Sequence, residues 1–395
     1  MKILILSSST GGGHDMRARS ISQWCATYNS TNSNLQTARY QGLEQTSPLY
    51  AFGVAIYNWI QKTWPRLHHI YFNFLEVFQV SSHEACLLGK QRYIEALRTH
   101  QPDVIVSVHA HLNHAFRKIA QDTLPEVQFV TYCGEMYGGY GFSKHWVDPK
   151  ADLFIGATAE ICEAARRCGM PEHRNYHGGF MLHPNFYGPK LSQTEKQHFL
   201  EQLDLQPNRF TLLLSTGANG AQNHQAFLNH LAEAQLDLQV IALCGRNTQA
   251  KSDLDEWAKA HPQLSVKALA QVENMFPLMQ CCDTIVARPG TGTTSEAIQA
   301  NCPILFNAIG GIMPQEWITV KYCRANQLPA QPIKRSSQLI DQLRPIVEQP
   351  ARLAAIKTTM RPLIPTAQPS GMLNKITQLV GETTDPLDSN RQRIR

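Results

Sequence analysis

Two glycine clusters in this chain stand beside titratable side chains in a pattern suited to phosphate chemistry. The first cluster, Thr10-Gly11-Gly12-Gly13-His14, follows the apolar run Ile3–Leu6. Glycine lets the backbone approach a ligand closely, and a helix that starts just after the glycines favours an anion at its N-terminus. The imidazole of His14, with an ordinary pKa of about 6.5, could remove a proton from an acceptor hydroxyl. A plain tight turn with a histidine at a helix start explains the same residues.

The second cluster, Arg288-Pro289-Gly290-Thr291-Gly292-Thr293, follows the apolar run Thr284–Ala287 and precedes Glu296. Gly290 and Gly292 permit a tight turn from strand to helix, and Thr293 could cap that helix. The backbone N–H groups at the helix start would receive the diphosphate of a nucleotide. Glu296, one turn further on, could accept hydrogen bonds from both ribose hydroxyls, while Arg288 supplies positive charge. This combination indicates a nucleotide site more strongly than either glycine run does.

Two further loops follow apolar runs in the second half of the chain. The loop Ser215–Gly220 would face the phosphates through Gly217 and Asn219, and Cys244–Asn247 places Arg246 at the same sheet edge. Each loop by itself is typical of an ordinary strand-to-helix connection. The first glycine turn lacks the GxGxxG spacing and the later acidic residue of a nicotinamide site, which disfavours that cofactor.

Apolar runs alternate with helical patterns in both halves, as in parallel sheets covered by helices. Strands are predicted at 2–7, 104–108, 127–132, 153–155, 210–215, 238–244, 264–267, 284–287 and 304–307. Helices fit 14–28, 84–99, 113–121, 158–168, 222–235, 249–260, 272–280, 293–300 and 315–325. The predicted fold is α/β, with two Rossmann-like domains that face each other across a cleft. The domains are expected at 1–185 and 209–365, with a linker at 186–208, a helix at 366–383 that could pack back on the first domain, and a disordered tail at 384–395.

Composition limits the possible partners and compartment. The 395 residues suit two α/β domains, and a net charge of +5 without a basic tail disfavours nucleic acid but is compatible with phosphates or lipid headgroups. Ten irregularly spaced cysteines without a CxxC pair indicate reduced thiols in a cytoplasmic protein. The apolar Met1–Leu6 is expected to be a first strand and not a signal peptide, and no apolar run reaches the roughly 18 residues of a membrane span.

Residues 48–80 are rich in aromatic side chains, with the basic residues Lys62 and Arg66 among them. Leu49, Phe52, Ile56, Trp59 and Ile60 share one helical face. Aromatic rings beside basic residues suit the surface of a bilayer, where amphipathic helices lie flat. The expected lipid contacts are Tyr57, Trp59 and Trp64. Ordinary packing of two helices in a core is the alternative.

A set of segments that runs in order along about residues 1–330 resembles one known family. These segments are Thr10–His14; Ser107–His109; Gly169–Pro171 with Gly178, Gly179 and Pro184; Cys244–Asn247; Gly290–Thr293 with Glu296 and Ala297; Pro303–Leu305 with Asn307; and Gln315 with Glu316. The family contains monogalactosyldiacylglycerol synthase, processive diacylglycerol glucosyltransferases and, more distantly, the peptidoglycan N-acetylglucosaminyltransferase. The resemblance implies a GT-B fold, an inverting transfer and a UDP-sugar donor, with no bound cofactor and no essential metal.

Carried over onto matching positions, the resemblance implies a role for each motif. His14 would be the general base, Gly11–Gly13 the turn facing acceptor and phosphate, and the backbone around Ala268–Val272 the reader of uracil. Gln315 and Glu316 would contact the sugar. The residues expected to bind the donor are Gly217, Asn219, Arg246, Arg288, Gly290, Thr291, Gly292, Thr293, Glu296, Gln315 and Glu316.

The sequence departs from the family pattern after the strand at 127–132. The family usually has a Thr-Asp pair there, whereas Thr131 is followed by Tyr132-Cys133-Gly134-Glu135. Either the base has no acidic partner, or Glu135 takes that place as the second catalytic residue. The run His109-Ala110-His111-Leu112-Asn113-His114 looks like a metal cluster, but it begins at a strand end where the family has histidines. A structural or cleft-lining role is favoured over metal binding.

The expected activity is transfer of a hexose from a UDP-sugar to a hydroxyl of a lipid acceptor, with diacylglycerol favoured. The protein would be cytoplasmic and bound peripherally to the cytoplasmic face of a membrane, with no nucleic-acid partner. Three alternatives stay open: a soluble or polyprenyl-linked acceptor, a UDP-sugar epimerase of the same fold, and a non-catalytic protein that binds UDP-sugar or lipid.

Overall fold

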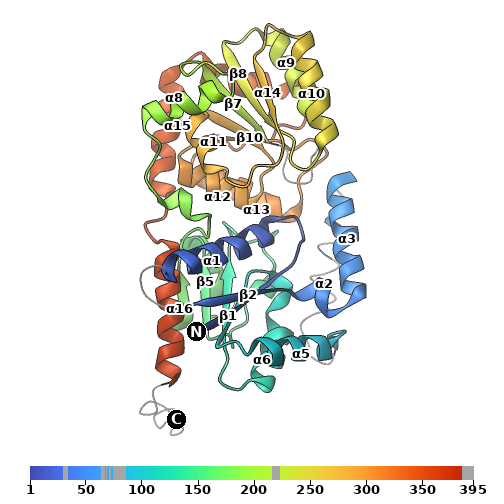
Figure 1. Cartoon of the computed structure of the whole chain (residues 1–395), viewed down its shortest axis with the longest axis vertical. Coiled ribbons are helices and arrows are strands. Elements are labelled where there is room, and N and C mark those ends of the chain that lie inside the picture. Colours follow the sequence, from blue (N-terminus) through green and yellow to red (C-terminus); the bar gives the residue numbers. More distant parts are fainter. Residues whose placement is uncertain are drawn as a thin grey trace. The chain divides into compact units, whose positions relative to one another are not determined.

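A computed structural model describes residues 1–29, 34–63, 67, 69, 70, 73, 86–215 and 223–384 of the chain. It divides into two compact units (Figure 1). The first comprises Met1–Ile60, His68–Pro184 and Thr366–Arg395, and the second comprises Gln61–Leu67 and Asn185–Pro365.

The first unit is built on a parallel sheet with the strand order β2-β1-β3-β4-β5-β6. Its strands are β1 Lys2–Ser7, β2 Gln36–Gln41, β3 Val104–Ser107, β4 Gln128–Cys133, β5 Leu153–Gly156 and β6 Asn175–His177. The inner strands β1, β3, β4 and β5 are buried along almost their whole length, which explains their continuous apolar runs. The edge strands β2 and β6 are largely polar and half-exposed, so the sequence pattern did not predict them.

Helices cover this sheet and complete its core. They are α1 Gly13–Asn29, α2 Gly42–Thr46, α5 Lys90–His100, α6 His114–Thr123, α7 Ala159–Arg167 and α16 Pro369–Thr384. Helix α3 Pro48–Thr63 is largely exposed where its side chains are described, and its residues from Gln61 onward belong to the second unit. Leu4, Ile105, Phe116 and Phe154 lie fully buried between sheet and helices, and burying each such side chain contributes about 1.5–3 kcal/mol. The C-terminal helix α16 belongs to this unit, where Tyr28 on α1 donates a hydrogen bond to Oδ1 of Asn374 at 2.7 Å.

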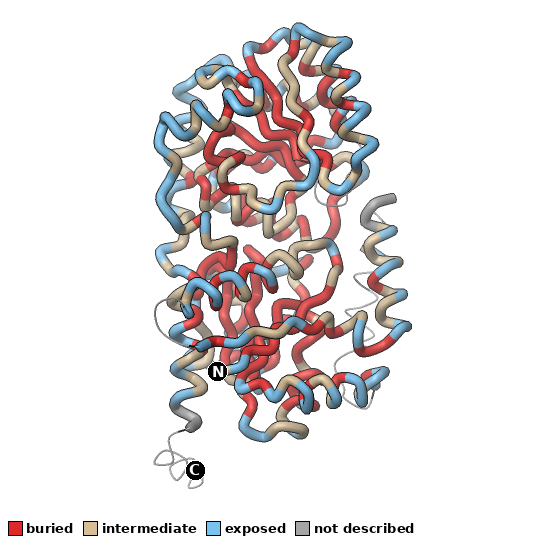
Figure 2. Tube along the Cα trace, in the orientation of Figure 1, coloured by how far each residue is buried: buried red, intermediate tan, exposed pale blue. Residues whose placement is uncertain are grey.

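The second unit has a parallel sheet with the strand order β11-β10-β7-β8-β9. Its strands are β7 Phe210–Ser215, β8 Leu238–Leu243, β9 Val266–Leu269, β10 Thr284–Ala287 and β11 Ile304–Phe306. Its helices are α8 Gln193–Gln202, α9 His224–Ala234, α10 Thr248–Ala260, α11 Phe276–Cys281, α12 Thr291–Ala300, α13 Pro314–Ala325, α14 Gln338–Val347 and α15 Pro350–Met360. The sequence pattern did not predict α14 and α15. Figure 2 shows the buried interior of both sheets in red.

Each sheet reverses its strand order once, and this reversal positions the candidate site. In the first unit the chain leaves β1 for β2 on one side and returns to β3 on the other. In the second unit the same reversal falls between β7 and β10. Ligands of open α/β sheets bind beyond the carboxyl ends of strands at such a point. The two glycine clusters follow β1 and β10, so both lie at these reversals.

None of the helices in the described part of the chain is long and apolar enough to cross a membrane.

Candidate active site

The three glycines in the turn after β1 have two different structural roles. Gly11 and Gly12 have φ values of 69° and 79°, a left-handed backbone that strongly favours glycine. Gly13 opens α1, and a Cβ atom there would meet nothing within 4 Å. Packing in the protein therefore does not require Gly13 to be a glycine. The open space above it is where a ligand could approach the start of α1.

His14 is held in one orientation by the main chain. Its Nδ1 lies 2.7 Å from the carbonyl oxygen of Val108. Because a carbonyl can only accept, Nδ1 carries the proton and Nε2 keeps a lone pair. The His109 ring packs edge-on against His14 at a centroid distance of 4.4 Å, and Trp146 lies at 5.9 Å. Within the described residues no group hydrogen-bonds to Nε2, so this nitrogen can accept a proton.

Burial and, to a lesser extent, the positive charge of Arg17 together lower the pKa of His14 to about 3. The ring is therefore neutral at physiological pH, which is the state a general base requires. Once protonated, the ring would need the negative charge of a bound substrate for stabilisation.

Glu135 is buried beside Arg17, which donates Nη2 to the carbonyl oxygen of Gly134 at 2.7 Å. Burial raises the pKa of Glu135, and the charge of Arg17 opposes this shift. The Nδ1 position of His14, where an acidic partner would bind, is taken by the Val108 carbonyl. The orientation of His14 thus comes from the main chain, and a catalytic role for Glu135 stays a prediction.

The histidine run of residues 109–114 begins beside His14 with His109, which also bonds to the glycine turn. The Nε2 atom of His109 lies 3.0 Å from the Thr10 hydroxyl, and its Nδ1 atom accepts the N–H of His111. The ring of His111 is 5.0 Å from that of His145. Across the described residues, no group of three or more His, Cys, Asp or Glu side chains is arranged to hold a metal ion.

In the second unit, helix α12 presents an open N-terminus at the end of β10. The helix begins at Thr291 after Gly290, and no side chain caps it. The prediction that Thr293 caps this helix is wrong, because the helix starts two residues earlier and Thr293 is its third residue. A Cβ atom on Gly290, whose φ is −77°, would meet nothing within 4 Å. The first-turn amides and the open space at Gly290 together make a site suited to an anion.

Glu296 lies on the second turn of α12. No hydrogen bond or ion pair joins its carboxylate to any residue that the structure describes. Burial raises the pKa of Glu296 to about 7. Glu296 is half-buried, and a carboxylate that has lost much of its water without gaining a partner is costly, so this arrangement favours a ligand that donates hydrogen bonds to it.

The half-buried Arg288 and the buried Glu316 form an ion pair that the sequence did not reveal. Arg288 Nε donates to Glu316 at 2.9 Å, and its Nη atoms donate to the carbonyl oxygens of Ile309 and Gly311 at 3.0 and 2.7 Å. Glu316 also accepts the N–H of Met313 at 2.9 Å. The pair ties the end of β10 to the loop before α13. Their expected contacts with phosphate and sugar stay predictions, since both groups are already engaged here.

The loop after β8 meets the segment expected to read uracil. Arg246 Nε donates to Oε1 of Gln271 at 3.3 Å, and Asn247 caps α10 by accepting the N–H of Ala250. Gln271, which the sequence did not single out, thus joins Arg246 at the carboxyl edge of the sheet. Gln315 is half-buried at the start of α13. Gly217 and Asn219 lie outside the described residues.

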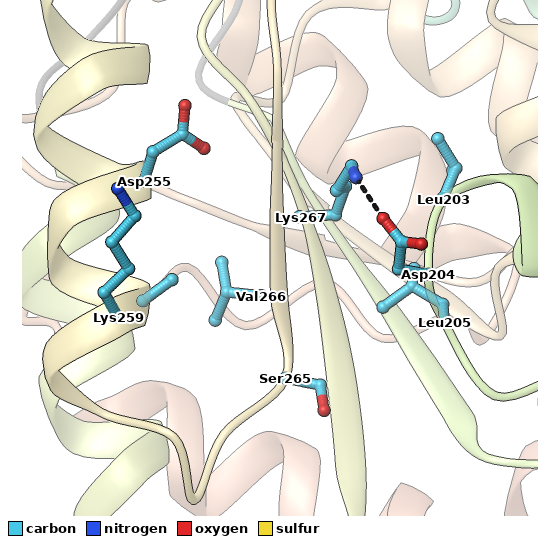
Figure 3. Close-up of a pocket in the computed structure, with 9 residues that line it drawn as sticks. Leu203, Asp204, Leu205, Asp255, Lys259, Ser265, Val266 and Lys267 are labelled. Atoms are coloured by element: carbon cyan, nitrogen blue, oxygen red, sulfur yellow. Dashed lines mark hydrogen bonds and ion pairs between the residues drawn. The ribbon is translucent and has the colours of Figure 1, made fainter.

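A shallow pocket of about 480 Å³ lies beside the first residues of β9 (Figure 3). Asp255 and Lys259 of α10 line one side, and Asp204 lines the other, where it pairs with Lys267 at 2.8 Å. The pocket includes Ser265, just before β9, whereas ligands of such sheets bind beyond the carboxyl ends. It contains none of the predicted donor residues, so we do not assign the donor to it.

Helix α3 exposes much of the aromatic segment. Leu49 and Phe52 are each 62% exposed and Trp59 is 56% exposed, while Tyr57 is half-buried. Among the side chains described in α3, only Val54 is buried. This exposure does not fit ordinary core packing for the described part of the segment. Trp64, Tyr71, Phe72, Phe74 and Phe78 lie outside the described residues.

Comparison with known proteins agrees with this architecture, although no family model matches the chain. The processive diacylglycerol beta-glucosyltransferase of Bacillus licheniformis is 24% identical over 319 residues, which cover 77% of this chain and 76% of that protein. Monogalactosyldiacylglycerol synthase 1 of Arabidopsis thaliana is 25% identical over 349 residues, which cover 82% of this chain and 61% of the plant protein. The chain is a distant homologue of these glycosyltransferases.

Solved structures show that this glycosyltransferase has the GT-B fold. MurG of Acinetobacter baumannii has a TM-score of 0.57 at 13% identity, covering 96% of this chain and 98% of that one. Anabaena Alr3699/HepE, solved in complex with UDP, has a TM-score of 0.56 at 14% identity. The match covers 97% of this chain and 100% of that one. The family resemblance and the GT-B fold predicted from the sequence are both confirmed.

Proposed function

We propose that this glycosyltransferase moves a hexose from a UDP-sugar to a hydroxyl of a lipid, with diacylglycerol as the favoured acceptor and inversion at the anomeric carbon. The observation that carries the proposal is the second-unit site at α12. There an uncapped helix start, open space at Gly290 and the unpartnered carboxylate of Glu296 occur together. These are the groups that a diphosphate and a ribose would need.

The donor would bind through complementary hydrogen bonds. The first amides of α12 would receive the diphosphate, and Glu296 would accept from the ribose hydroxyls. The main chain after β9, which Gln271 links to Arg246, would lie along uracil. Gln315 would contact the sugar. The complex of Alr3699/HepE with UDP supports a nucleotide of this kind.

The first unit would supply the base. Nε2 of His14 would take the proton of the acceptor hydroxyl, and the oxygen would attack the anomeric carbon from the face opposite UDP. As the new C–O bond forms, the bond to the diphosphate breaks and its electron pair leaves with UDP. Amides at the start of α12 would stabilise the charge that develops on the leaving diphosphate. No side-chain carboxylate is needed to orient His14, because the Val108 carbonyl does so.

Helix α3 supports a lipid acceptor presented at a membrane surface. Its exposed apolar residues Leu49, Phe52 and Trp59 recur at helical spacing and so share one face. The sequence between Glu44 and Glu76 contains no acidic residue but includes Lys62 and Arg66. An apolar face with a positive charge balance is complementary to an anionic bilayer. We therefore propose peripheral binding to such a membrane, and the names of the relatives support diacylglycerol as acceptor.

The test is a transfer assay with defined components. The protein would be incubated with UDP-glucose, UDP-galactose or UDP-N-acetylglucosamine and with phosphatidylglycerol vesicles that contain diacylglycerol. We expect a glycosylated lipid in mass spectrometry, and its loss in His14→Ala with UDP affinity unchanged. Conversion of a UDP-sugar to its epimer without any acceptor would contradict the proposal. So would sugar transfer only to soluble alcohols, or UDP binding without turnover.

A further inference from the structure

Side chains from outside the glycine turn hold the turn that precedes His14. Glu44 on α2 accepts the N–H of Ser9 at 2.7 Å and the hydroxyls of Ser9 and Ser8 at 2.6 and 3.1 Å. Asn58 on α3 accepts the N–H of Gly11 at Oδ1 and donates through Nδ2 to the carbonyl of Ser9, both at 3.1 Å. Asn58 thus bonds to the main chain on both sides of Thr10.

The turn has little support of its own. Gly11 and Gly12 take a left-handed backbone, and glycine is the residue with the most conformational freedom. Among the described residues, the turn at 8–11 makes no main-chain hydrogen bond to main chain, and the first such bond beyond it runs from Met16 N–H to the Gly12 carbonyl at 3.1 Å. Its conformation therefore depends on side chains: Glu44, Asn58 and His109, which bonds to the Thr10 hydroxyl at 3.0 Å. Of these three, Asn58 is the one on α3.

Asn58 and the exposed apolar residues lie on different faces of the same helix. Val54 and Asn58 are four residues apart, so they share the face that meets the rest of the first unit. Phe52 and Trp59, seven residues apart, share the exposed face. Figure 2 shows the coloured part of α3 mostly in tan and pale blue. Because few of the side chains described in α3 are buried, little packing opposes a shift of the helix when its exposed face finds a partner.

We propose that Asn58 couples contact between α3 and an anionic lipid surface to the conformation of the glycine turn, and thereby to the placement of His14. This inference rests on the membrane contact in the proposed function. Asn58 is a positioning residue, since it touches the turn and acts on the base only through it. The loss of two neutral hydrogen bonds changes an equilibrium by up to about 150-fold, which bounds the coupling.

The test compares two acceptors with the full-length protein. Transfer would be measured to diacylglycerol in phosphatidylglycerol vesicles and to a short-chain diacylglycerol dissolved as monomers. We expect the wild-type kcat to be higher with diacylglycerol in vesicles than with the monomeric short-chain diacylglycerol. In Asn58→Ala the rate with vesicles divided by the rate with the monomeric acceptor should fall at least fivefold. Sedimentation with vesicles and the KM for UDP-sugar should stay as in wild type. Asn58→Asp, which keeps the acceptor for Gly11 N–H and loses the donor to Ser9, should give an intermediate ratio.

A matched variant on the other face of α3 separates binding from coupling. Phe52→Ser should lose sedimentation with vesicles, whereas Asn58→Ala should keep it. An equal fall of both rates in Asn58→Ala would overturn the inference, because Asn58 would then only support the turn. Equal wild-type kcat values on both acceptors would overturn it too, while leaving the proposed function standing. Absence of transfer to either acceptor would instead overturn the proposed function and, with it, the coupling.

Discussion

Replacing Glu296 by glutamine is expected to weaken UDP binding strongly at pH 8 and hardly at all at pH 6. Burial raises the pKa of this carboxyl to about 7. At pH 6 about nine-tenths of the wild-type side chain is protonated and resembles a neutral amide, whereas at pH 8 about nine-tenths is ionised. Only the ionised form accepts charge-assisted hydrogen bonds from the ribose.

The size of the effect follows from these hydrogen bonds. Bonds to a charged group contribute about 1.5–3 kcal/mol and neutral bonds about 0.5–1.5 kcal/mol. The difference of about 1–1.5 kcal/mol predicts that the Kd of Glu296→Gln for UDP is roughly tenfold that of wild type at pH 8. At pH 6 the two Kd values should agree within about twofold.

Isothermal titration calorimetry in buffers of different ionisation enthalpy measures both affinity and proton release. The terminal phosphate of UDP itself titrates at a pKa of about 6, so the glutamine variant serves as the control for that effect. Near pH 7 the wild type should release about half a proton more than the variant on binding UDP. A ratio of Kd values that stays the same from pH 6 to pH 8 would refute the assignment of Glu296 to the ribose.

The same substitution should stabilise the free protein at high pH. There the ionised Glu296 lowers the free energy of unfolding, whereas an ordinary paired carboxylate raises it. A pKa raised from 4.5 to about 7 means that the folded state holds the proton more tightly than the unfolded state. The contribution of Glu296 to the free energy of unfolding is therefore fully present below pH 4.5. It is lost as pH rises through 7, by up to about 3 kcal/mol. Glu296→Gln should accordingly raise the unfolding temperature at pH 8 and leave it unchanged near pH 4.5. No gain at pH 8 would show that the carboxylate is stabilised in the free protein.

Three further predictions concern neighbouring groups. Gly290→Ala should leave the unfolding temperature unchanged, because its Cβ meets nothing within 4 Å. It should lower UDP affinity about tenfold or more, because the methyl group fills the space proposed for the phosphates. Unchanged affinity would contradict the proposed diphosphate site. Glu316→Ala should destabilise the fold by about 1–3 kcal/mol in denaturant unfolding, since it leaves the half-buried Arg288 without its counter-ion but with the carbonyls of Ile309 and Gly311. Unchanged stability would show that the pair is not structural. In Glu296→Gln, kcat/KM should stay flat down to about pH 5, because burial lowers the pKa of His14 to about 3; an acid limb near pH 6.5 would show that His14 titrates normally.

Much of the fold was predictable because its signals are local. Inner strands such as β1 and β7 are buried on both faces, so they appear in the sequence as short continuous apolar runs. A glycine cluster directly after such a run must lie at the carboxyl edge of a parallel sheet. The order of the family's motifs along the chain needs no coordinates either. For these reasons the two parallel sheets, the GT-B fold and the candidate positions of His14 and Glu296 followed from residue types and spacing.

Contacts between distant segments were decided only by the tertiary structure. The sequence shows Arg288 as a free positive charge, but the packing of helix α13 beside the end of β10 brings it to Glu316, where the two form an ion pair. His14 is oriented by a carbonyl at Val108, and a main-chain atom leaves no mark in residue types. Asn58 looks like one polar residue in an aromatic helix until folding brings it to Gly11. Spacing along the chain reveals neighbours within one turn of helix or strand, whereas the packing of separate elements determines which charges are paired and which stay available for a ligand.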